Sequence, residues 1–220
     1  MPVLAIVHTT TATVEPLRAL AAELLPAWHV TNFVDDSILP QLAANGGDLA
    51  AVAPRVLQYM QFAEQTGADV VLEACSSIGE LAGPARAALG IPVVRIDEAM
   101  AAAAVARGKT IGVAATLPTT LEPTKRLLLE QAALAGRAIT LRQALASDAY
   151  RLLMAGDRAG HDRALAAVLL ELAPQVECVV LAQASMARVL PQLPADQRDK
   201  FLASPRLAIE SVRQLQASKR

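Results

Sequence analysis

The stretch DVVLEACSS, residues 69–77, decides the fold, because a close copy of it, ECVVLAQAS, occupies residues 177–185. Each copy places a short, uninterrupted apolar run directly before small polar residues. Such a run is typical of a strand that is buried on both faces of a parallel sheet. The small residues that follow the first run indicate a turn into a helix. We therefore expect one strand to lead into Cys75 and a matching strand to lead into Gln183.

Two further blocks recur in the same order along the chain. The motif TVEP at residues 13–16 returns as TLEP at residues 120–123, a shift of 107 positions (120 − 13). The shift between the first two copies is 108 (177 − 69), and residues 92–97 match residues 205–210 with a shift of 113 (205 − 92). Ordered recurrence at a nearly constant offset indicates two α/β halves that are related by a pseudo-two-fold axis.

Short apolar runs alternate with longer segments whose apolar residues recur three and four positions apart, as on one face of a helix. The runs occupy residues 3–7, 70–72, 93–96, 111–115 and 179–181. This alternation predicts an α/β protein of two Rossmann-like (flavodoxin-like) halves, each a parallel sheet with helices on both faces. Residues 1–96 with 207–220 form the first predicted half, and residues 97–206 form the second. Ligand crevices in such sheets lie beyond the carboxyl ends of the strands, so we expect an active site in a cleft between the halves.

The composition argues against several classes of function. The 220 residues are more than half apolar, the formal net charge is −1, and there are only three Phe, two Tyr and one Trp. Neither a basic stripe nor a set of stacking rings is present, so we expect no nucleic acid partner. No apolar run approaches the length of a membrane span, and the amino terminus lacks the pattern of a signal peptide. A cytoplasmic protein without a membrane partner is predicted.

No cofactor or metal motif is recognisable. The sequence contains neither of the glycine-rich phosphate-binding fingerprints. The three histidines, His8, His29 and His161, are far apart, and neither Cys75 nor Cys178 has a partner at the spacing of a metal site. We expect no cofactor, no metal and, in a reducing compartment, two free thiols.

Cys75 is the strongest candidate for chemistry. It closes an apolar run, and Ser77 with Glu80 has the spacing of a capping box that begins a helix. A thiol at a helix amino terminus is stabilised as thiolate, which predicts a lowered pKa and a reactive cysteine. The alternative is an ordinary core cysteine. Cys178, at the start of the matching strand, is interpreted as core.

Threonine-rich turns follow the first strand of each predicted half. Hydroxyls and free backbone amides between a strand and a helix make a good cradle for a carboxylate. Threonine is also a common helix cap, so capping is the alternative reading of these turns. We expect substrate-binding hydroxyls in both turns and after both matched strands. These residues are Thr9, Thr10, Ser76, Ser77, Thr116, Thr119, Thr120 and Ser185.

Two further polar residues lie close to the predicted site. His8 ends the first strand and is a candidate second proton carrier or hydrogen-bond donor, although a lone histidine is more often structural. Glu73 lies two residues before Cys75, and hence on the same side of its strand, where it either tunes the thiol or binds an unrelated partner.

From these residues the chain resembles the aspartate/glutamate/hydantoin racemase superfamily over nearly its whole length. Residues 70–77 are similar to the first cysteine motif of that superfamily, and residues 116–120 resemble its second-half Thr loop. The resemblance implies two cysteines that flank the substrate Cα, one thiolate removing a proton while the opposite thiol delivers one, without pyridoxal phosphate. Gln183 stands here at the position of the second cysteine, and a glutamine neither accepts nor gives a proton at neutral pH. The Asp-Ser of the glutamate racemase branch is also absent, with His8 and Thr9 in its place.

The resemblance and the single thiol together predict a cofactor-independent isomerase of racemase or epimerase type that acts at the Cα of a small carboxylate or amino-acid-like substrate. Its catalytic residues would be Cys75, Gln183 and His8, with Gln183 as a hydrogen-bond donor to an enediolate-like intermediate. Three alternatives remain open. They are a decarboxylase similar to arylmalonate decarboxylase, an isomerase in which Cys75 is a covalent nucleophile, and a non-catalytic protein that binds a small carboxylate. A homodimer or a larger homo-oligomer is consistent with the resemblance.

Overall fold

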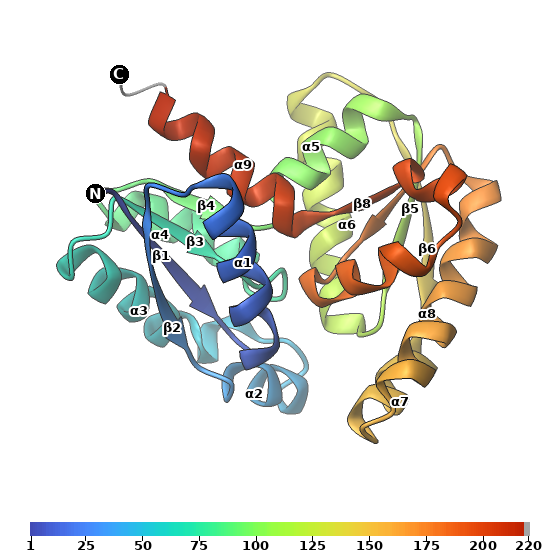
Figure 1. Ribbon diagram of the computed structural model, residues 1–220, viewed down its shortest axis with the longest axis horizontal. Helices are drawn as coiled ribbons and strands as arrows, with labels where there is room; N and C mark the ends of the chain where they lie inside the picture. Colours follow the sequence, from blue (N-terminus) through green and yellow to red (C-terminus); the bar gives the residue numbers. More distant parts are fainter. Residues whose placement is uncertain (218–220) are drawn as a thin grey trace. The chain divides into compact units, whose positions relative to one another are not determined.

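The computed structural model describes residues 1–217, which fold as two compact units. Unit 1 comprises Met1–Ile96 together with the chain from Pro205 on, and unit 2 comprises Asp97–Ser204. Each unit is an α/β layer structure around one parallel sheet of four strands, as the alternation of apolar runs predicts (Figure 1).

In unit 1 the strands follow the order β2-β1-β3-β4, and every adjacent pair is parallel. The strands are β1 (Val3–His8), β2 (His29–Val34), β3 (Val70–Glu73) and β4 (Val93–Arg95). The helices are α1 (Val14–Leu24), α2 (Ile38–Ala44), α3 (Ala53–Gln65), α4 (Ala82–Ala88) and α9 (Ser204–Ala217). Short 3-10 segments are η1 (Thr11–Thr13), η2 (Leu49–Ala51) and η3 (Gly79–Leu81).

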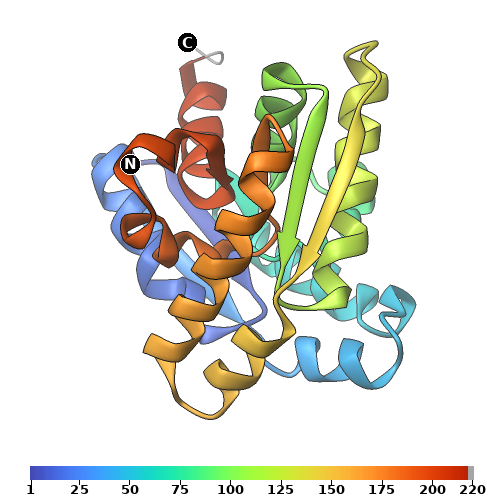
Figure 2. The same cartoon turned by 90° about the vertical axis from the view of Figure 1, so that its right-hand side faces the viewer.

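Unit 2 repeats this topology, with the order β6-β5-β7-β8 and all neighbours parallel. Its strands are β5 (Thr110–Ala115), β6 (Thr140–Leu145), β7 (Cys178–Leu181) and β8 (Phe201–Ala203). Its helices are α5 (Glu98–Arg107), α6 (Pro118–Leu134), α7 (Ser147–Met154) and α8 (Arg158–Leu172). Its 3-10 segments are η4 (Ala173–Gln175), η5 (Ala184–Gln192) and η6 (Ala195–Lys200). Figure 2 shows β5 and β6 side by side.

The internal repeat is visible in the hydrogen bonds that join the first and third strands of each unit. In unit 1 a carboxylate oxygen of Asp69 accepts the backbone N–H of Val3 at 2.8 Å. At the matching place in unit 2, a carboxylate oxygen of Glu177 accepts the backbone N–H groups of Lys109 and Thr110 at 2.6 and 2.7 Å. The predicted pairing of residues 69–77 with 177–185 is therefore confirmed.

The third predicted repeat is wrong. Residues 92–97 contain β4, but residues 205–210 lie in helix α9. The strand that pairs with β7 as β4 pairs with β3 is β8, because Val71 is the register partner of Val93 and Val179 is the register partner of Phe201. The offset of this pair is again 108 (201 − 93), so the apparent shift of 113 came from a chance similarity between a strand and a helix.

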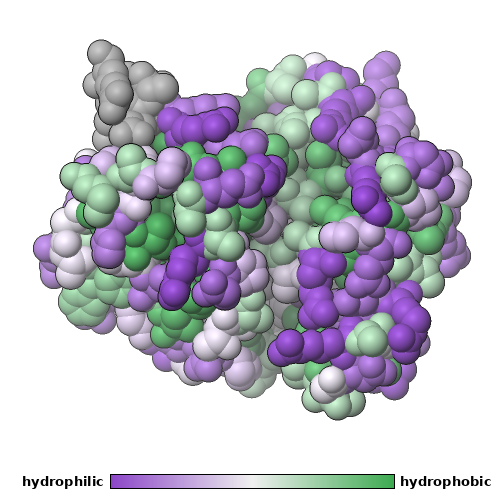
Figure 3. Space-filling model, viewed as in Figure 1, coloured by the Kyte–Doolittle hydropathy of each residue, from purple (hydrophilic) through white to green (hydrophobic). Residues whose placement is uncertain are grey.

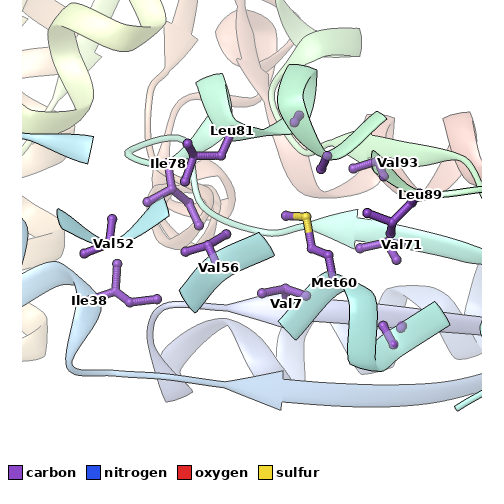
Figure 4. Packing of buried hydrophobic residues seen from close by; sticks show 14 of the residues in the cluster. Val7, Ile38, Val52, Val56, Met60, Val71, Ile78, Leu81, Leu89 and Val93 are labelled. Atoms are coloured by element: carbon purple, nitrogen blue, oxygen red, sulfur yellow. The ribbon is translucent and has the colours of Figure 1, made fainter. Parts of the chain in front are cut away.

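Apolar side chains from strands and helices meet in the core of unit 1. Figure 4 shows Val7 and Val71, from β1 and β3, packed with Val56 and Met60 on one face of α3 and with Ile78. All five are buried. Burying an aliphatic side chain of this size contributes on the order of 1.5–3 kcal/mol. The core thus fixes the segment that contains Ile78, which follows Cys75 by three residues.

Hydrophilic and hydrophobic side chains are interspersed on the face of the molecule that Figure 3 shows. Among residues 1–217, no helix has both the length and the apolar character that crossing a membrane would require.

Candidate functional site

The Cys75 turn of unit 1 runs from the end of β3 to the 3-10 segment η3. The backbone N–H of Ile78 donates to the carbonyl oxygen of Cys75 at 3.0 Å, which closes the turn. The cap of η3 is Ile78, and no side chain caps it, so the predicted capping box of Ser77 and Glu80 is not formed. Helix α4 begins only at Ala82. The expectation that the thiol lies at a helix amino terminus is therefore wrong.

Two buried residues hold the turn in place. Ile78 is fully buried in the core of unit 1 (Figure 4). Gly79 lies against the buried side chain of Arg95, and a Cβ added at position 79 would overlap Arg95 Nε. Glycine is required at this position because the guanidinium occupies the space of a side chain.

Burial raises the pKa of the Cys75 thiol to about 11, and the negative charge of Glu73 adds to the shift. The hydroxyl of Thr9 and the backbone N–H groups of Ser77 and Ile78 oppose it, but they do not outweigh desolvation. Although part of Cys75 remains accessible to solvent, the sulfur is protonated at neutral pH. The prediction of a lowered pKa is therefore wrong, because desolvation of the buried sulfur outweighs the hydrogen bonds that favour the thiolate.

Three buried hydroxyls surround this turn. The hydroxyl oxygens of Thr9, Ser76 and Ser77 form no hydrogen bond with a nitrogen or oxygen atom among the described residues. A buried hydroxyl without a partner costs free energy, which an anionic ligand could recover by accepting hydrogen bonds. Thr10, by contrast, has a local role, because its hydroxyl accepts the N–H of Ala12 and caps η1.

His8 is fully buried and both of its ring nitrogens are engaged within unit 1. Nδ1 lies 2.8 Å from the hydroxyl of Thr13, and Nε2 lies 2.9 Å from the side-chain oxygen of Asn32. Burial lowers the pKa of His8, so the ring is neutral. The histidine joins the end of β1 to η1 and β2, and neither nitrogen is left for a substrate. The structure therefore favours the structural reading of His8.

In unit 2, Gln183 follows β7 at the position that matches Cys75. Its side-chain oxygen accepts the backbone N–H of Thr116 at 2.7 Å and the hydroxyl of Thr116 at 2.8 Å. Because a backbone N–H can only donate, the atom that faces it must be the amide oxygen. The side-chain NH₂ of Gln183 consequently points away from Thr116. It is a hydrogen-bond donor whose orientation is fixed by the fold.

The other candidate residues of unit 2 are less distinctive. The hydroxyl of Thr120 donates to the carbonyl oxygen of Leu117 at 2.9 Å, as a local capping bond at the start of α6. Thr119 is half-buried and Ser185 is exposed. The structure thus brings Thr116 and Gln183 together, while Thr120 has the capping role that was the alternative reading.

Sequence reasoning missed a buried polar network in unit 2. One carboxylate oxygen of Asp162 lies 2.8 Å from His161 Nδ1, and the other accepts from Arg188 Nη2 at 3.0 Å and Gln192 Nε2 at 2.9 Å. Asp162 lies in the first turns of α8, whereas Arg188 and Gln192 belong to η5, the segment directly after Gln183. The only sequence signal was the adjacent polar pair 161–162 at the start of an apolar helix. Hydrogen bonds from His161 and Gln192 and the charge of Arg188 hold the pKa of Asp162 below its usual value against the effect of burial.

The described residues contain no group of three His, Cys, Asp or Glu side chains that could bind a metal ion. The turn in unit 1 combines a protonated thiol with buried hydroxyls, and the turn in unit 2 presents an oriented amide. Within unit 1, the thiol and the hydroxyls are groups that can deliver a proton and donate hydrogen bonds to an oxyanion; within unit 2, the amide of Gln183 is a further group that can donate to one.

Comparisons with known proteins agree with the α/β fold of the two units. A model of the Asp/Glu/hydantoin racemase family matches residues 4–212. Among solved structures, the chain is similar to an allantoin racemase from Klebsiella pneumoniae (TM-score 0.74, 19% identity, covering 100% of this chain and 89% of that one). It is also similar to a glutamate racemase from Francisella tularensis subsp. tularensis SCHU S4 in complex with D-glutamate (TM-score 0.77, 15% identity, 99% and 82% covered). A third is a putative Asp/Glu racemase from Yersinia pestis (TM-score 0.74, 17% identity, 96% and 97% covered). No curated protein sequence matches the chain.

Proposed function

Because the chain belongs to the Asp/Glu/hydantoin racemase family, we propose that it is a cofactor-independent isomerase that moves a proton at the Cα of a small carboxylate. Cys75 is its one proton-carrying thiol in this proposal. The observation that supports it most is the Cys75 turn, where a protonated thiol lies among three buried hydroxyls that have no nitrogen or oxygen partner.

The hydroxyls provide what such a reaction needs besides the thiol. When a proton leaves Cα, negative charge moves onto the substrate carboxylate as an enediolate. Donors that are already oriented stabilise that charge at little reorganisation cost. The hydroxyl oxygens of Ser76 and Ser77 are held in place by the buried turn and have no nitrogen or oxygen partner, so they can donate to a bound oxygen. The Thr9 hydroxyl, which donates to the Cys75 sulfur, can do the same when it turns from the sulfur to that oxygen. In this isomerisation the thiolate form of Cys75 takes the proton from Cα onto Sγ, and the same sulfur then returns a proton to the carbon.

Gln183 fills a different role from the cysteine that the family pattern has at its position. Its amide cannot exchange a proton with carbon, but its fixed NH₂ group can donate a hydrogen bond to an oxyanion. The two hydrogen bonds from Thr116 orient that group without help from a ligand. We therefore assign Gln183 to stabilisation of the intermediate and Cys75 to proton transfer.

A second candidate, decarboxylation, is favoured by the protonation state of the thiol. A thiol with a pKa of about 11 is ready to give a proton and poorly suited to remove one at neutral pH. In a decarboxylation the C–C bond breaks and CO₂ leaves. The electron pair of the broken bond remains on the substrate as an enediolate. The enediolate carbon takes the proton of Cys75 Sγ, and the resulting thiolate recovers a proton from water. This reaction uses a single acid, whereas isomerisation also needs a base.

The experiment that tests these alternatives is NMR in heavy water with a panel of amino acids, hydantoins, malonates and hydroxy acids. Exchange at Cα supports the isomerase, and release of CO₂ with deuterium at Cα supports the decarboxylase. Either activity should disappear in Cys75→Ala and persist in Cys178→Ala, because Cys178 is buried in β7. A folded protein that binds members of the panel without exchange or decarboxylation would overturn both proposals in favour of a binding protein.

A matched pair of variants tests the role of Gln183. Gln183→Glu retains an oxygen that can accept from Thr116 but has no NH₂ donor, whereas Gln183→Ala removes both. If the amide donor stabilises the intermediate, Gln183→Glu should lose at least as much activity as Gln183→Ala. Activity close to that of the parent protein in Gln183→Glu would contradict this assignment.

A further inference from the structure

Glu73 is the last residue of β3, and its side chain is fully buried. It precedes Cys75 by two residues, and one of its carboxylate oxygens accepts the backbone N–H of Cys75 at 2.6 Å. A charge-assisted bond of this length is strong, and it fixes the direction in which the amide of Cys75 points. The amide faces the carboxylate and is therefore not available to an anion at the sulfur.

We propose that Glu73 is a positioning residue that, together with burial, holds Cys75 as a proton donor, because it binds the Cys75 amide and places a negative charge beside the sulfur. This inference rests on the proposed function, in which the thiol delivers a proton. It follows from the geometry of one hydrogen bond and one charge. The carboxylate engages an amide that could otherwise stabilise a thiolate, and its negative charge close to the sulfur opposes a second negative charge there.

The other charged groups around the turn do not reverse this effect. Arg95, on β4, is the register partner of Glu73 and packs beneath Gly79. Glu80, on η3, is exposed to solvent, which screens its charge. His8, at the end of β1, is neutral, and its ring nitrogens are engaged by Thr13 and Asn32. The groups that favour the thiolate are the Thr9 hydroxyl and the amides of Ser77 and Ile78, and they are outweighed.

The test is the pH dependence of the alkylation of Cys75 by iodoacetamide, read by mass spectrometry of the full-length protein. Only thiolate reacts, so the rate rises with pH until the thiol pKa is passed, which in the parent protein is about 11. Glu73→Gln keeps the shape and an acceptor for the Cys75 amide but removes the charge. We expect its profile to move to lower pH. Lowering the thiol pKa by about 1 would raise the alkylation rate near pH 8 roughly tenfold, because the thiolate fraction rises by that factor.

Two controls accompany this experiment. Glu80→Gln makes the same substitution on the same turn at an exposed position, and its profile should match the parent protein. Cys178 is buried and should remain unlabelled in every variant that is folded, so its labelling reports unfolding. An unchanged Cys75 profile in folded Glu73→Gln would overturn the proposal.

If Glu73→Gln does not fold, Glu73→Asp replaces it. Aspartate keeps the charge but is one methylene shorter, so it releases the Cys75 amide. The profile should then move to lower pH, because the released amide can donate to the sulfur, and an unmoved profile would refute the proposal. Alkylation requires no turnover. If the alkylation profile shifts in a protein that exchanges no substrate proton, the proposed function is refuted, but the effect of Glu73 on the thiol is still supported.

Discussion

Replacing Asp162 with alanine should destabilise unit 2 by about 3 kcal/mol. Breaking a buried ion pair by removing one partner costs roughly 3–5 kcal/mol, since the remaining donors lose their acceptor and the buried ones cannot bind water instead. His161 is almost completely buried, whereas the side chain of Arg188 is 41% exposed and can regain water. That exposure places the expected loss at the low end of the range.

The assay is urea denaturation followed by far-UV circular dichroism, with the fluorescence of Trp28 as a reference. Trp28 is the only tryptophan and belongs to unit 1, so its signal reports the unit that the substitution does not touch. With an m-value on the order of 2 kcal/mol per M, the midpoint of unit 2 should fall by about 1.5 M. The difference in free energy of unfolding between the parent protein and Asp162→Ala should shrink below about pH 4. The pKa of Asp162 is lower in the folded protein than in the unfolded chain, so the stability it contributes is present above the unfolded value and lost as pH falls through the folded one.

Asp148→Ala is the matched control. Asp148 also binds an arginine, at 2.7 Å from Arg151 Nη2, but both side chains are more than 70% exposed. An exposed pair of this kind is worth about 0–1 kcal/mol. If Asp162→Ala and Asp148→Ala shift the midpoint equally, the reasoning that burial makes the Asp162 network strong is refuted.

Three further expectations concern single residues. Gly79→Ala should cost about 1–3 kcal/mol in urea denaturation, because the new methyl group would displace the buried guanidinium of Arg95, and a neutral result would show that Arg95 moves freely. The pKa of His8 is lower in the folded protein than in the unfolded chain, so below about pH 6.5 the unfolded chain binds a proton that the folded chain does not. The parent protein should therefore lose stability as pH falls below about 6.5. Thermal unfolding of His8→Asn at pH 5 to 7 should show a weaker pH dependence than that of the parent protein. Cys178 should react with a thiol reagent only in denaturant; labelling at the rate of native Cys75 would contradict its burial in β7.

The strands that carry the candidate site and the edge strand β4 could be predicted from sequence, whereas the edge strands β6 and β8 of unit 2 could not. β3 and β7 are buried on both faces, so their sequences are continuous apolar runs. Only two of the six residues of β6 are even half-buried, and β8 has three residues, so neither leaves a pattern that stands out.

The chemical state of the candidate residues depended on partners that local spacing does not reveal. Ser77 and Glu80 have the spacing of a cap, but the turn is held by the burial of Ile78 and by the fit of Gly79 against Arg95. His8 looked available because its partner Asn32 lies 24 positions away on the neighbouring strand. Desolvation of the Cys75 sulfur is likewise a property of the packed unit, so sequence reasoning predicted the wrong direction for the shift of its pKa.

The acidic side chains that join the first and third strands of each unit bear on how the sequences of the two copies could diverge after duplication. Asp69 and Glu177 each accept backbone N–H groups at the amino-terminal end of the first strand of their unit, β1 and β5 respectively. The candidate catalytic residues lie at the other end of these strands, where one copy carries Cys75 and the other Gln183. Because these bonds are made far from that end, they would persist when residues there change, and each copy could acquire new reactivity while it still folded.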